Sequence, residues 1–77
     1  MSGYELDALE LYRRLDACRH ERGISWRAIG RETRLSPCVF TRLGQGRAPD
    51  AHALLTLLVW LDLDADIAFA IKPREQQ

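Results

Sequence analysis

The sequence has few of the residues that build metal, cofactor or disulfide sites. Among its 77 residues are two cysteines, Cys18 and Cys38, and two histidines, His20 and His52, whose spacing fits no metal-ligand pattern. Two cysteines are no disulfide framework, so we expect a reducing, cytoplasmic compartment. No glycine-rich phosphate loop and no patterned set of nucleophile, base and acid is present. The sequence therefore predicts no enzymatic activity, no metal and no cofactor.

Long apolar runs are also missing. The longest, residues 54–61, is interrupted by Thr56 and is too short to span a bilayer. The first ten residues carry three acids and no apolar core of signal-peptide length, so we expect no membrane span and no export. A chain of this length forms one domain over residues 1–77, and so small a core often depends on oligomerisation.

Lysine is nearly absent, and positive charge is carried by arginine. Net charge is zero, but it is unevenly distributed. Residues 1–22 hold four arginines against five acids, and residues 48–77 hold two basic residues against five acids. Residues 23–47 hold five arginines against one glutamate, a net charge of +4. A basic middle predicts a face that meets a polyanion, with a solvated basic face as the alternative.

The basic middle has the pattern of two short helices joined by a turn. Ser25 can cap the first helix, and Ser36 followed by Pro37 can cap the second. We predict helices over residues 26–33 and 37–44, a turn at 34–35, and an end at Gly46. This is a helix-turn-helix, a motif whose second helix lies in the DNA major groove.

Apolar periodicity predicts three further helices. They cover residues 5–22, 51–61 and 64–71, and a frayed tail follows over 73–77. Residues 64–71 also alternate like a strand, and we favour the helix because alanine is a poor strand former. The fourth helix has more apolar surface than one stripe requires, which indicates burial on two sides or a protein contact. The expected core consists of Leu11, Leu15, Cys18, Ile29, Leu35, Phe40, Leu43, Leu54, Leu57, Leu58 and Leu61.

The ordered set of apolar and turn residues from position 11 to 71 resembles the Xre family, the Cro/repressor-type helix-turn-helix proteins, and short actinobacterial single-domain members in particular. The resemblance implies a compact, all-α, five-helix domain of the lambda-repressor-like type that binds DNA operators as a dimer. The matching residues are Leu11, Leu15, Arg19, Gly23-Ile24-Ser25, Ile29, Leu35-Ser36, Phe40, Leu43, Gly46-Arg47, Pro49-Asp50 and Leu61-Asp62-Leu63.

The resemblance also implies which residues meet DNA. Those expected to face the bases are Pro37, Cys38, Val39, Thr41 and Arg42. Those expected to face the phosphates are Ser25, Trp26, Arg27, Arg34, Ser36, Gln45 and Arg47.

Three of these assignments have alternatives. Arg42 can donate two hydrogen bonds to a guanine, or it can clamp a phosphate or pair with Glu32. Trp26 can pack against the sugar-phosphate backbone or cover the edge of the core. Cys38, near a helix N-terminus, is interpreted as a small residue that permits close approach rather than as a redox switch.

The chain departs from the family pattern at three positions. Arg34 stands where the turn usually has glycine, so a non-glycine residue has to adopt a left-handed conformation. Gly44 replaces the usual glutamate, which leaves Arg19 for a phosphate or for Asp16. Asp62 replaces the usual glycine after the fourth helix.

The sequence thus predicts a sequence-specific transcriptional regulator, a repressor that acts as a dimer on palindromic double-stranded DNA. The predicted dimer surface consists of Trp60, Leu63, Ile67 and Phe69. The alternative is a protein-interaction module, such as the antitoxin of a toxin–antitoxin pair, in which DNA binding is secondary.

Overall fold

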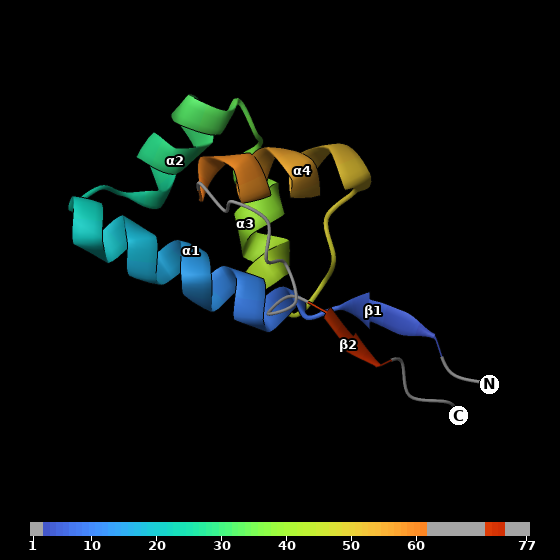
Figure 1. The fold of residues 1–77 in the computed structure, drawn as a ribbon. Helices are drawn as coiled ribbons and strands as arrows, with labels where there is room; N and C mark the ends of the chain where they lie inside the picture. Colours follow the sequence, from blue (N-terminus) through green and yellow to red (C-terminus); the bar gives the residue numbers. More distant parts are fainter. Residues whose placement is uncertain (1–2, 62–70, 74–77) are drawn as a thin grey trace.

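The structure is a computed structural model that describes residues 3–61 and 71–73. This part of the chain is mostly helical, with four helices and two short strands (Figure 1). In chain order the elements are β1 (Tyr4–Leu6), α1 (Ala8–Arg22), α2 (Trp26–Thr33), α3 (Pro37–Gly44), α4 (Ala51–Trp60) and β2 (Ile71–Pro73). Among the described residues, no helix is long and apolar enough to cross a membrane.

Short polar side chains cap the helices at the predicted positions. The Ser25 hydroxyl accepts a hydrogen bond from the backbone N–H of Ala28 at 3.1 Å, which starts α2. The Ser36 hydroxyl accepts a hydrogen bond from the N–H of Cys38 at 3.2 Å, and α3 begins at Pro37. Each cap satisfies a backbone donor that has no partner inside the helix. The predicted bounds of α2 and α3 are therefore confirmed.

The turn between α2 and α3 has the predicted strained backbone. Arg34 adopts φ 59° and ψ 32° and is the C-cap of α2. The Leu35 N–H then donates to the Gly30 carbonyl at 3.1 Å and closes the turn. A non-glycine residue in this conformation carries a steric cost, which the fixed geometry of the turn imposes.

The core lies where α1, α2, α3 and α4 converge. Five side chains in it are fully buried: Leu11, Leu15, Ile29, Leu43 and Leu57. Phe40 is also buried, whereas the other predicted core residues of α4, and Cys18 on α1, are only half-buried. The α1 helix packs against α3, and α2 packs against both α3 and α4.

The first helix begins later than predicted. It starts at Ala8 rather than Glu5, because Asp7 is its N-cap and accepts a hydrogen bond from the Glu10 N–H at 3.2 Å. Residues Tyr4–Leu6 form β1 instead. Residues 5–7 were predicted to be the first residues of the helix, but Asp7 instead caps the helix and so separates it from β1.

The predicted helix over 64–71 is wrong at its last residue. Ile71 lies in β2, which pairs antiparallel with β1 through Leu6↔Ile71, Glu5↔Lys72 and Tyr4↔Pro73. Positions 62–70 lie outside the described residues, so the five-helix count is not confirmed. In Figure 1 the two-stranded sheet of β1 and β2 projects from the helical body.

Candidate nucleic-acid interface

The outer face of α3 is polar and exposed. Pro37, Cys38, Thr41, Arg42 and the following Gln45 are all exposed. Val39, also predicted to face bases, is half-buried and packs against the core, so only part of its side chain is available. The α3 face is therefore free of packing within the described chain, as a recognition helix requires.

The five arginines of residues 23–47 have no acidic partner among the described residues. All five, at positions 27, 31, 34, 42 and 47, are exposed, and none pairs with a carboxylate in the part of the chain that the structure describes. The arginines of α1 behave differently. Arg13 and Arg14 pair with Glu10, and Arg19 pairs with Asp16 at 2.7 Å. The unpaired positive charge is thus concentrated on the predicted DNA-binding segment.

The alternative pairing of Arg42 with Glu32 is wrong. The Glu32 carboxylate instead accepts a hydrogen bond from the Trp60 indole N–H at 2.8 Å. It also lies 3.6 Å from the Arg22 guanidinium, which stacks over the Trp60 ring. Arg42 is exposed and pairs with no carboxylate among the described residues, so its guanidinium donors can meet a ligand.

Trp26 covers the edge of the core. Its ring stacks on Tyr12, with centroids 4.9 Å apart, and lies 5.5 Å from Phe40 in a tilted arrangement. The Arg19 guanidinium lies 5.3 Å from the ring centroid. The edge-of-core interpretation is confirmed, and contact of Trp26 with phosphate stays a prediction.

Gly44 makes room for the same aromatic cluster. A Cβ atom at this position would lie 3.3 Å from Tyr12 Cε1, tighter than ordinary contact. Arg19 donates two hydrogen bonds to Asp16 and one to the Ile24 carbonyl. The predicted alternative of an Asp16 partner is confirmed.

The hydroxyl oxygens of Ser25 and Ser36 accept the capping hydrogen bonds, which leaves the O–H donor of each side chain for a phosphate. Both serines are exposed, and the first backbone N–H groups of α2 and α3 follow them. Helix N-termini of this kind attract phosphate through these N–H groups and the helix dipole. Arg27 is exposed one residue inside α2.

The predicted dimer surface is represented by one residue. Trp60 is half-buried and is held within the chain by Glu32 and Arg22. The other three residues, Leu63, Ile67 and Phe69, lie outside the described residues. On α4, Leu55 and Val59 are 62% and 79% exposed, so they are not buried on a second side within the described chain, and the predicted alternative of a protein contact is untested.

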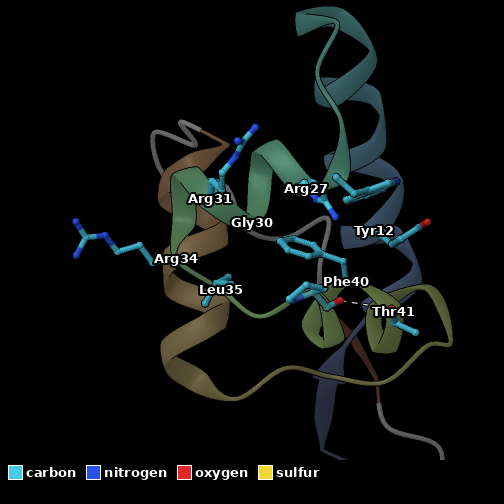
Figure 2. A pocket seen from close by; sticks show the side chains of 10 residues that line it. Tyr12, Arg27, Gly30, Arg31, Arg34, Leu35, Phe40 and Thr41 are labelled. Atoms are coloured by element: carbon cyan, nitrogen blue, oxygen red, sulfur yellow. Dashed lines mark hydrogen bonds between the residues drawn. The ribbon is translucent and has the colours of Figure 1, made fainter.

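A cleft between α1, α2 and α3 was not predicted from the sequence. Its volume is about 520 Å³, and three aromatic rings and three arginines contribute to its wall (Figure 2). It is lined by Tyr12, Trp26, Arg27, Gly30, Arg31, Arg34, Leu35, Pro37, Phe40 and Thr41. These residues come from α1, α2, α3 and the turn between α2 and α3, so only the packing of the helices brings them together.

Comparison of the chain with known protein families, curated proteins and solved structures finds no match. Among residues 3–61 and 71–73, no group of three or more histidine, cysteine or acidic side chains is placed to hold a metal ion.

Proposed function

We propose that this protein is a sequence-specific, double-stranded-DNA-binding transcriptional regulator of the Xre type. The observation that carries the proposal is the contrast between its arginines. Those of α1 each pair with a carboxylate, whereas the five of residues 23–47 are exposed and pair with no carboxylate among the described residues. Arginines that neutralise DNA phosphates release bound counterions, and this release favours binding to DNA.

In the proposed complex α3 enters the major groove. Arg42, in the exposed face of α3, reads a base, with Thr41 beside it. Pro37 and Cys38, at the start of α3, are short side chains that let the helix approach the base edges. Arg27, Arg34 and Arg47 contact phosphates and position the helix.

The protein acts as a repressor in the simplest version of this mechanism. Two copies bind a palindromic operator with half-sites about 34 Å apart and exclude polymerase. The dimer contact assigned to Trp60, Leu63, Ile67 and Phe69 remains part of the proposal.

Fluorescence anisotropy with a labelled duplex tests DNA binding directly. We expect Arg42→Ala to weaken binding to a selected site by about 1–3 kcal/mol, with a smaller effect on random duplex. Arg13→Ala is the matched control, because it removes an exposed arginine that pairs with Glu10 on α1. Equal losses for both variants would contradict a base-reading role.

A second candidate function is favoured by the exposed apolar face of α4. Leu55 and Val59 suit a protein partner, such as the toxin of a toxin–antitoxin pair. Leu55→Ser with Val59→Ser would then abolish partner binding while leaving DNA affinity unchanged. Loss of DNA binding in this variant, with the fold intact, would instead assign the face to the DNA-binding dimer.

A further inference from the structure

The cleft between α1, α2 and α3 combines an aromatic wall with positive charge. Three rings line it: the Trp26 ring contacts that of Tyr12 on one side and that of Phe40 on the other. Gly30 also lines the cleft, and a side chain at this position would occupy space next to the Phe40 ring. Flat apolar walls of this kind suit a planar ring.

Among the described residues, the charge lining the cleft is of one sign. Arg27, Arg31 and Arg34 contribute to its wall, and no acidic side chain of residues 3–61 does. Arg27 lines the cleft together with Tyr12 and Phe40, whereas Figure 2 shows the side chain of Arg34 extending away from the rings. Arg27 has no carboxylate partner among the described residues, so the lining includes a guanidinium that no described acid neutralises.

We propose that this cleft binds a planar aromatic carboxylate, whose ring packs against Tyr12, Trp26 and Phe40 and whose carboxylate pairs with Arg27. An arginine fork donates two parallel hydrogen bonds to a carboxylate, and the rings exclude water from one side of the pair. An uncharged ring cannot form the ion pair with Arg27, and an anion without a ring cannot pack against the aromatic wall. The cleft therefore selects for both features together.

Binding in the cleft excludes DNA. Arg27, Arg34, Pro37 and Thr41 line the cleft and also belong to the proposed DNA surface. A carboxylate on Arg27 takes the donors that a phosphate needs, and a ring against Pro37 obstructs the start of α3. This regulatory step rests on the proposed function, whereas ligand binding itself does not.

A nuclear magnetic resonance titration of the full-length, ¹⁵N-labelled protein with 2-naphthoate tests the site. The chain has two tryptophans, Trp26 in the cleft wall and Trp60 outside it, so the second indole signal is an internal control. We expect a saturable shift of the Trp26 indole N–H with a Kd of about 1 mM or below, and no shift for Trp60.

Two further ligands separate the ring from the charge. The neutral 2-naphthylmethanol is expected to bind about tenfold more weakly than 2-naphthoate, because it cannot pair with Arg27. Inorganic phosphate at matched ionic strength is expected to leave the Trp26 indole unshifted. A phosphate response as strong as that of 2-naphthoate would show a plain anion site and overturn the proposal.

Arg27→Gln is expected to weaken 2-naphthoate about tenfold and to abolish the difference between the acid and the alcohol. Arg47→Gln is the matched control, because Arg47 is exposed and unpaired but does not line the cleft. Loss of folding alone would not erase the acid–alcohol difference selectively. The proposal is overturned by an absent or non-saturating Trp26 shift, by equal shifts of both indoles, or by an acid–alcohol difference that survives Arg27→Gln.

Competition with DNA tests the exclusion. At a 2-naphthoate concentration ten times its Kd, the apparent Kd for duplex DNA is expected to rise about elevenfold. If 2-naphthoate binds and the protein has no DNA affinity, the cleft stands and the proposed function fails. If DNA affinity is unchanged by saturating 2-naphthoate, the exclusion is refuted.

Discussion

Arg34 shows at the residue scale how the turn constrains this chain. It occupies a left-handed conformation at φ 59°, which glycine adopts without steric cost. The resemblance to the Xre pattern predicted this strain, because that pattern usually has glycine at this position. The side chain is exposed and pairs with no carboxylate among the described residues, as the proposed contact with phosphate requires.

Arg34→Gly should therefore separate stability from binding. We expect the free energy of unfolding to rise by about 0.5–1 kcal/mol, because relief of the left-handed strain exceeds the extra chain entropy of glycine. The melting temperature should rise by about 4 °C, as calorimetry would show. DNA affinity should fall. Arg31→Gly, inside α2, is the control and should lower stability by about 1 kcal/mol. A lower melting temperature for Arg34→Gly would contradict this view of the turn.

The elements of the fold were predictable to different degrees. Local capping signals specify α2 and α3, since Ser25 and Ser36 each act within three residues of their own position. Strands β1 and β2 pair segments that are far apart in the sequence, and the alternation over 64–71 indicates a strand but not its partner. The aromatic cleft was missed for the same reason. Tyr12 reaches Trp26 only when α1 packs against the helix-turn-helix.

Trp60 joins three helices at their C-terminal parts. Its indole N–H donates to Glu32 on α2, and Arg22 on α1 stacks over its ring at 4.5 Å. Trp60→Phe keeps a ring but loses the donor, so we expect a loss of roughly 0.5–1 kcal/mol in chemical denaturation, the lower end of the range because the bond is exposed. In a double-mutant cycle Glu32→Gln should add little to Trp60→Phe. Fully additive losses would show that the two residues are not coupled.

Charge is organised over the whole molecule rather than along any one element. The net charge of zero hides a positive helix-turn-helix between two acidic segments. Arginines on α1 pair with nearby carboxylates, whereas those of residues 23–47 pair with no carboxylate among the described residues. Affinity for DNA should therefore depend steeply on salt despite the neutral total.

The slope of log K against log salt reports how many phosphates the protein neutralises. Arg47→Gln should reduce the slope of log K against log salt by about 1, with a similar loss of affinity on all duplex sequences. The titration is made by anisotropy over a range of salt concentrations. Arg14→Gln is the control, because Arg14 pairs with Glu10 on α1, and its slope should equal that of the unaltered protein. Equal decreases in slope for the two variants would argue against a localised DNA face.

Selection from a random-sequence duplex pool, followed by sequencing, tests the central claim most directly. We predict enrichment of a palindromic motif with half-sites about one helical turn apart, and loss or relaxation of one base position in each half-site for Arg42→Ala. Absence of any enriched motif at low salt would contradict sequence-specific recognition by the helix-turn-helix.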